Sequence, residues 1–188
     1  MLKNYPYRVP RVSQGELVEL TDAHDRPLLV APRLGVRRLG LTRRVVLVAL
    51  RDTRQRIYIQ QRGPRCDAMP GCWDLSATGH VQAGESREDA ARRELDEEIN
   101  IRRARLIRLA EHAPDEGSNS FSTLFLAGPT GERPEPNPEE VSGGMFLDED
   151  ELKALADYSP ELITPALRWA MSTGRLFPSK KRAETFGE

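Results

Sequence analysis

The sequence has 188 residues, with 28 Lys and Arg against 29 Asp and Glu, which gives a formal net charge of -1. This length predicts one domain with short extensions, and the near-neutral charge disfavours polymeric nucleic acid or an anionic membrane surface as the main partner, since both attract a basic surplus. The hydrophobic content of 38% is sufficient for a core, and no run approaches the roughly 18 apolar residues of a spanning helix. The first residues lack the apolar segment of a secretory signal, and the two cysteines are too few for a disulfide framework, so we expect a cytoplasmic protein.

The N-terminal part of the chain predicts β structure. Residues 1–15 have no period and are expected to form a loose arm. Short apolar runs separated by polar turns predict strands at residues 16–20, 27–30, 43–50 and 57–60. The first two are expected to form a hairpin and the last two an antiparallel pair, followed by a loop over 63–71 that contains Gly and Pro.

A helix is predicted over residues 86–99. Ser86 and Asp89 form a capping-box pattern at its start. Apolar residues spaced by four are expected to face the core, namely Ala91, Leu95 and Ile99. Asn100 stands where a left-handed residue commonly ends a helix.

The remaining residues predict two further strands and two helices. The strands are expected at 121–127 and 141–147, on either side of a Pro-rich loop over 128–140, with Gly143-Gly144 as a bulge or a point of close approach. Helical patterns cover 148–157 and 160–172, and 179–188 is expected to be a flexible tail. We therefore expect a single α+β domain over 16–178, with a mixed sheet sandwiched between helices.

Three carboxylates within the predicted helix indicate a site. Glu94, Glu97 and Glu98 are related by three and four residues, so they project from one face of the helix. Like charges at this spacing repel, and Mg²⁺ with oxygen ligands is a suitable counter-charge. The glycine-containing segment 79–84 is expected to be a loop whose backbone approaches the same place. The alternative is a solvated helix face with ion pairs from Arg92 or Arg93.

The segment around this helix resembles the Nudix box of the MutT-related Nudix hydrolase superfamily. That pattern is Gly, five residues, Glu, seven residues, Arg-Glu, apolar, any, Glu-Glu, any, Gly, apolar. Its positions are matched within 79–101 by Gly79, Glu85, Arg93, Glu94, Leu95, Glu97, Glu98 and Ile101. The single departure is Asn100 in place of the final Gly, which the helix-ending role of Asn makes benign.

The resemblance implies a fold, a reaction and roles for these residues. It implies a Nudix fold and hydrolysis of a diphosphate linked to another group, with Mg²⁺ or Mn²⁺ bound by Glu94, Glu97 and Glu98. It also implies that Arg93 pairs with Glu85 and braces the loop against the helix. The general base varies between members, so Glu94 or a loop acid remains open. On this resemblance the catalytic residues are Glu85, Arg93, Glu94 and Glu98.

Wider stretches resemble Nudix proteins of the isopentenyl-diphosphate-isomerase-like branch. They are residues 16–22, 57–62, 70–81, 159–161 and 164–165. The isomerases carry a Cys immediately before the box Gly, where this chain has Thr78, and a metal-binding His in the strand before the Gln-Arg run, where residues 41–44 contain none. A hydroxyl cannot replace the thiol in that acid–base step, so a hydrolase is favoured over an isomerase.

Four residues near the box are candidates for substrate binding. Arg62 and Arg65 precede the box and could clamp phosphate, with a solvated loop as an equal alternative. Gly79 allows the backbone to approach substrate. His80 follows it and could contact substrate, although a loop His bonded to backbone is at least as well supported.

Other residues keep two interpretations. Trp73 could stack a nucleobase, but a core role is favoured, and Cys66 and Cys72 are interpreted as packed thiols rather than nucleophiles. Glu139 and Glu140 precede a late strand, where many Nudix enzymes place a further acidic ligand or base. A polar loop edge is the alternative, favoured slightly more for Glu139 than for Glu140.

The leading function is Mg²⁺-dependent hydrolysis of a small phosphorylated metabolite, such as a nucleoside di- or triphosphate. The alternatives are an isomerase and a non-catalytic domain that senses a nucleotide or sugar phosphate. Such sensors often lose box carboxylates, and this chain keeps all of them. The sequence permits a homodimer formed through the N-terminal arm but does not require one.

Overall fold

The computed structural model describes residues 16–115 and 118–177, and the expected arm (1–15) and tail (179–188) lie outside them. Within these described residues, nine strands form one sheet: β1 (Leu17–Thr21), β2 (Pro27–Pro32), β3 (Arg43–Asp52), β4 (Ile57–Arg62), β5 (Trp73–Asp74), β6 (Ala77–His80), β7 (Leu106–His112), β8 (Ser120–Thr130) and β9 (Val141–Leu147). The helices are α1 (Arg33–Arg38), α2 (Arg87–Ile99), α3 (Glu149–Tyr158), a short 3-10 helix (Pro160–Leu162) and α4 (Pro165–Ser172).

The sheet is mixed, as the sequence predicts. β3 lies at its centre and pairs in parallel with β8, while its pairs with β1, β4 and β6 are antiparallel. β7 joins the far edge of β8, and β9 joins β4. The predicted hairpin is present, because β1 and β2 pair antiparallel.

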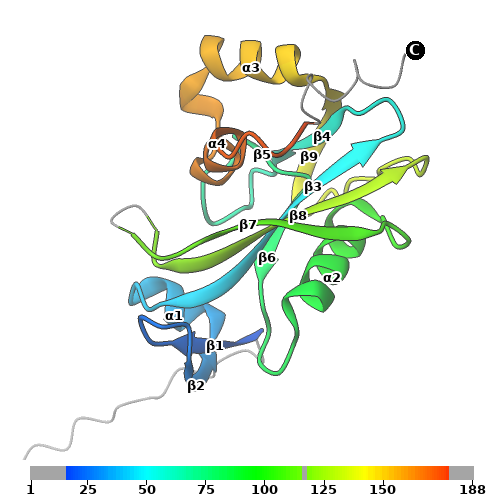
Figure 1. Cartoon of the computed structure of the whole chain (residues 1–188). Coiled ribbons are helices and arrows are strands. Elements are labelled where there is room, and N and C mark those ends of the chain that lie inside the picture. Colours follow the sequence, from blue (N-terminus) through cyan, green and yellow to red (C-terminus); the bar gives the residue numbers. More distant parts are fainter. Residues whose placement is uncertain (1–15, 116–117, 178–188) are drawn as a thin grey trace, which may run out of the picture.

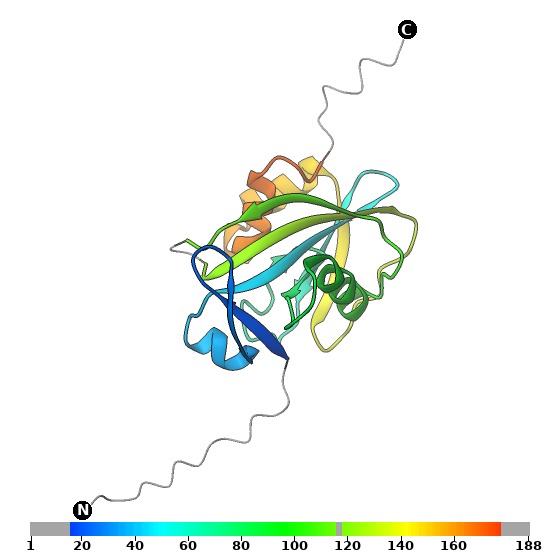
Figure 2. The same cartoon turned by 60° about the horizontal axis from the view of Figure 1, so that its bottom comes forward.

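Helices cover both faces of the sheet (Figure 1). Successive side chains of β3 point to opposite faces: Val46, Val48 and Leu50 pack with α2 in one core cluster, and Leu47 and Ala49 pack with α3 and α4 in another. Figure 2 shows the same layers from a second direction, with α2 separated from α3 and α4 by the strands. The predicted α/β/α arrangement is therefore confirmed.

The ends of α2 follow the predicted signals. The Ser86 side chain accepts a hydrogen bond from the Asp89 backbone N–H at 3.1 Å. Asn100 has a φ of 56° and donates its backbone N–H to carbonyls of the last turn. The predicted apolar stripe is buried, with relative exposures of 0%, 2% and 0% for Ala91, Leu95 and Ile99. These contacts fix the orientation of the buried carboxylates that border this stripe, Glu94 and Glu98.

Several elements of the structure differ from these expectations. Gly79 and His80 belong to strand β6 rather than to a loop. The helix expected over 160–172 is divided in two, because Pro165 disfavours helical backbone at Thr164, which instead caps α4. Strand β7 was not predicted, since exposed and half-buried residues do not alternate along it and a register irregularity between Arg108 and Ala110 interrupts its pairing with β8. The short helix α1 was not predicted either, because its start has no capping residue and no acidic residue in the first turn.

Gly144 is the expected point of close approach. A side chain there would overlap the Tyr58 ring on the neighbouring strand β4. A register irregularity between β4 and β9 lies beside Gly143, so the glycine pair combines both predicted roles. Among the described residues, no helix is long and apolar enough to cross a membrane.

Candidate active site

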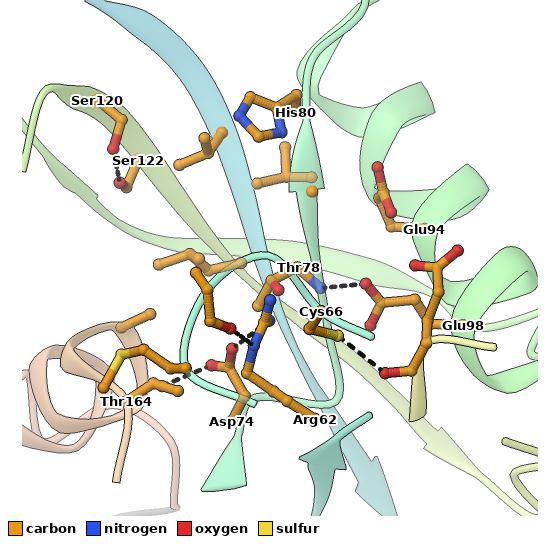
Figure 3. Close-up of a pocket in the computed structure, with 18 of the residues that line it drawn as sticks. Arg62, Cys66, Asp74, Thr78, His80, Glu94, Glu98, Ser120, Ser122 and Thr164 are labelled. Atoms are coloured by element: carbon orange, nitrogen blue, oxygen red, sulfur yellow. Dashed lines mark hydrogen bonds and ion pairs between the residues drawn. The ribbon is translucent and has the colours of Figure 1, made fainter. Parts of the chain in front are cut away.

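A pocket of about 810 Å³ extends from α2 across the sheet to α4. Its walls come from β3, β4, β6, β8, α2, α4 and the loop before β5. Figure 3 shows the carboxylates of Glu94 and Glu98 at one end, projecting from α2. Ser120 and Ser122 lie on a strand at the opposite end of the view. The pocket thus joins an acidic end to a hydroxyl-bearing end.

Glu98 is held at the acidic end by neighbours on two strands. Its side chain is 5% exposed. One carboxylate oxygen accepts a hydrogen bond from Gln60 Nε2 on β4, and the other lies 3.5 Å from the Thr78 backbone N on β6 (Figure 3). Gln60 is itself 2% exposed. Its role was not predicted, although a polar residue within the apolar run of β4 was a usable signal.

Glu94 lies against β6 in a space that only glycine leaves open. Its side chain is 6% exposed. A Cβ at position 79 would overlap the Glu94 carboxylate. Gly79 therefore contributes by lacking a side chain, because the backbone of β6 can then lie against the Glu94 carboxylate. The sequence predicted that the backbone of this segment approaches the site closely.

We expect Gly79→Ala to lower activity by roughly ten- to a hundredfold and the free energy of unfolding by about 1–3 kcal/mol, because the new methyl group displaces a buried carboxylate. Hydrolysis assays and urea unfolding measure the two effects. Gly143→Ala is the matched control, since no atom lies within 4 Å of a Cβ there. Equal behaviour of the two variants would contradict this role of Gly79.

Arg93 connects the loop before α2 to the carboxylates. Its guanidinium donates to both oxygens of Glu85 at 2.9 and 3.0 Å, to Glu94 at 2.7 Å and to Glu97 at 3.0 Å. It also donates to the backbone oxygen of His80 at 2.9 Å. The structure therefore pairs Arg93 with Glu85, as the resemblance implies. It also contains an ion pair on the helix face, between Arg93 and Glu97, as expected if these charges only stabilise a solvated helix.

The buried carboxylates have altered acidities. Burial raises the pKa of Glu94 to about 7, although the neighbouring Arg93 acts in the opposite direction. Burial also raises the pKa of Glu98 well above its usual range, and the charge of Glu94 raises it further. Two nearby carboxylates thus share a poorly solvated space, and one cation contacts only one of them directly.

The donor set fits a hard divalent ion. Glu94 and Glu98 supply buried carboxylate oxygens, and Gln60 Oε1 is buried without a hydrogen-bond partner among the described residues. Oxygen ligands of this kind suit Mg²⁺ and Mn²⁺. Within residues 16–115 and 118–177 no three Asp, Glu, His or Cys side chains form a ready group of metal ligands, because Glu97 is exposed and paired with Arg93. Glu97 would join an ion only after leaving Arg93.

The candidate substrate-binding residues have different surroundings. Arg62 lines the pocket but donates to Asp74 at 3.0 Å and to the Ala68 backbone oxygen at 2.9 Å, so it braces the loop before β5. Arg65 is exposed at the rim. The His80 ring accepts a hydrogen bond from Arg43 Nε at 3.1 Å. Arg43 was not predicted as a pocket residue.

Both loop acids, Glu139 and Glu140, are exposed and line the pocket. The charge of Glu140 contributes to the raised pKa of Glu98, after burial and the charges of Glu94 and Asp74. Its backbone oxygen accepts from the Cys66 thiol at 3.2 Å (Figure 3). Glu140 is therefore the better candidate for a further acidic group.

Several assignments concern packing. Trp73 packs against the core cluster of α3 and α4, as favoured from the sequence. Both cysteines are free thiols, with Cys72 buried. The residues at the far end of the pocket, including His112 and Trp169, were not predicted, because no sequence motif connects them.

Comparisons with known proteins agree with this geometry. A model of the NUDIX domain family matches residues 41–169. The Nudix hydrolase PA4841 of Pseudomonas aeruginosa is 35% identical over 135 residues, covering 72% of this chain and 80% of its own. The Nudix hydrolase YfcD of Escherichia coli K12 is 30% identical over 159 residues, covering 82% and 79%. The crystal structure of DR0079 from Deinococcus radiodurans has a TM-score of 0.73 and 27% identity, covering 85% of this chain and all of that one.

Proposed function

Because the chain belongs to the NUDIX domain family and is a Nudix hydrolase, we propose that it is a Mg²⁺- or Mn²⁺-dependent enzyme that cleaves the diphosphate linkage of a nucleoside di- or triphosphate or a derivative. The observation that carries this proposal is the pair of buried carboxylates, Glu94 and Glu98, at one end of a pocket large enough for such a ligand.

The residues at the acidic end have distinct proposed roles. A divalent ion held by Glu94, Glu98 and then Glu97 would supply charge neutralisation for the phosphate oxygens and a more acidic water. Arg93 fixes the loop before α2 through Glu85 and holds the Glu94 carboxylate. Gln60 orients Glu98. The general base is proposed to be a carboxylate of this end, Glu94 or the loop acid Glu140.

The pocket supports hydrolysis better than isomerisation. Thr78 lines the pocket at the position where the resembling isomerases carry a thiol, and its hydroxyl is too weak an acid for that task. At the start of β3 the pocket is lined by Arg43, not by a His. The isomerase-like branch, the cytoplasmic location and the homodimer stay predictions.

The test is metal-dependent release of phosphate and pyrophosphate from a panel of nucleotides, dinucleotides, sugar nucleotides and isoprenoid diphosphates. We expect release from the nucleotide group with Mg²⁺ or Mn²⁺, and release at background with EDTA, because the carboxylates then lack their cation. Full activity in EDTA would contradict the metal assignment. Binding of nucleotides without turnover of any panel member would favour the sensor alternative.

A further inference from the structure

The far end of the pocket differs chemically from the acidic end. Ser118, just before β8, and Ser120 and Ser122 on β8 form a line of hydroxyl groups, with oxygen separations of 2.7 and 3.3 Å. All three line the pocket. Because a hydroxyl has one donor and two acceptor positions, this line keeps hydrogen-bonding capacity toward a ligand.

Strand register places one imidazole beside these hydroxyls and a second one two strands away in the same row. His112 on β7 is directly opposite Ser122, Ser122 is directly opposite Val45, and Val45 is directly opposite His80. Directly opposed residues project from the same face of a sheet, and all four line the pocket. They form one row across four strands, with His80 nearest α2 and His112 farthest from it.

An indole completes this end. The Trp169 ring on α4 contacts the His112 ring edge-to-face, with 5.2 Å between ring centroids. His112 Nε2 also lies 3.3 Å from Asp115 Oδ2, which steadies the imidazole. Trp169 is half-buried and lines the pocket. We call Ser118, Ser120, Ser122, His112 and Trp169 the hydroxyl end.

These features distinguish between the groups that a diphosphate can carry. An isoprenoid chain here would cover hydroxyl and imidazole groups without giving them partners, which is unfavourable. A nucleoside offers both a planar base for the rings of Trp169 and His112 and polar edges for the serine hydroxyls. His80 and Gly79 are successive residues of β6 and therefore face opposite sides of the sheet, but the row and the Glu94 carboxylate line the same pocket, so one ligand can reach both ends.

We propose that the hydroxyl end binds the nucleoside of the substrate, with the base against Trp169 and polar atoms of the nucleoside bonded to Ser120 and Ser122. The proposal rests on the proposed hydrolysis of nucleotides, since it names the group that lies beyond the diphosphate. Trp169 and Ser122 are therefore specificity-determining residues.

The two tryptophans of the chain permit a direct binding test. In protein labelled with 5-fluorotryptophan, Trp73 and Trp169 give two ¹⁹F signals, which the variant Trp169→Phe assigns. We expect AMP, CMP, GMP or UMP in EDTA to shift the Trp169 signal saturably and leave the Trp73 signal unchanged, because Trp73 packs in the core and does not line the pocket. Isopentenyl diphosphate should shift neither signal.

This experiment separates the two proposals. No shift of Trp169 with any nucleotide, in protein that hydrolyses nucleotides when Mg²⁺ is added, overturns the hydroxyl end and leaves the proposed function intact. A saturable shift without hydrolysis under any metal supports the hydroxyl end and overturns the hydrolase proposal. A shift with isopentenyl diphosphate alone overturns the nucleoside assignment.

Steady-state kinetics give an independent readout. We expect Trp169→Ala to raise the KM for the nucleotide substrate by roughly tenfold or more with kcat within about twofold, as loss of base stacking predicts. Ser122→Ala removes one hydroxyl without changing the backbone and should raise KM in the same direction. A fall in kcat with unchanged KM in the folded Ser122→Ala variant would overturn the assignment.

Discussion

Replacing Glu98 by Gln is expected to lower kcat/KM by at least about 100- to 1,000-fold, since the substitution removes a carboxylate that would hold the divalent ion needed to neutralise the phosphate charge. The side chain is buried between β4 and β6, so no other described group can take its place without moving. The amide keeps the shape of the carboxylate and can still accept from Gln60. We therefore expect the fold to be retained.

Stability distinguishes loss of chemistry from loss of structure in Glu98→Gln. Burying a charge is costly, so the variant should unfold at a temperature equal to or above that of the metal-free parent. Glu88→Gln is a suitable control, because Glu88 is an exposed residue in the first turn of the same helix and should keep full activity. Wild-type turnover by Glu98→Gln at ordinary Mg²⁺ would refute its role as a metal ligand.

The parts of the fold that follow from local sequence were predictable. The buried run of β3, the cap at Ser86 and the turn at Asn100 each depend on residues within a few positions of one another. Strand β7 depends instead on pairing with β8. The residues of β7 show little hydrophobic periodicity, so the strand can be recognised only from its pairing with β8 in the folded protein.

The candidate site divides in the same way. Glu94, Glu98, Arg93 and Glu85 lie within one loop and helix, so their spacing in the sequence is enough to indicate a common site. His112 and Trp169 are 57 positions apart in the numbering and meet only because α4 packs on the face of the sheet from which the His112 side chain projects. Residues that specify the substrate are therefore harder to predict than residues that perform the chemistry.

Arg93 also explains why Glu94, Glu97 and Glu98 do not form a preassembled set of metal ligands in the described structure. Its Nη1 contacts both Glu94 and Glu97, so it satisfies part of their charge when no ion is bound. Burial alone would lower the pKa of Arg93, but its bonds with Glu85 and Glu94 raise it, so the cation persists at any working pH. A divalent ion must therefore compete with this arginine for Glu97.

The acidity of Glu94 predicts how metal-free stability depends on pH. Its pKa is raised by burial from 4.5 to about 7, with Arg93 opposing and Glu97 and Glu16 adding to the rise. Between these two values the folded protein binds more protons than the unfolded chain, so its stability falls as pH increases. The stabilising contribution of Glu94 protonation to the free energy of unfolding is complete below about pH 4.5 and is lost as pH rises through about 7.

In EDTA we expect the free energy of unfolding of the parent to fall by about 2–3 kcal/mol more than that of Glu94→Gln between pH 5 and pH 8. Urea unfolding at both pH values measures this difference, and comparison with Glu94→Gln isolates Glu94 from other raised carboxyls such as Glu98 and Asp74. Parallel losses in the two proteins would show that Glu94 does not titrate in this range.

Magnesium should reverse this loss at pH 8. An ion that binds only the folded protein stabilises it by mass action, and it binds the deprotonated carboxylates that destabilise the metal-free state. We therefore expect Mg²⁺ to raise the melting temperature of the parent at pH 8 more than at pH 5, and to raise that of Glu94→Gln little at either. The same buried charge that weakens the metal-free fold at neutral pH would then be what binds the ion needed for hydrolysis.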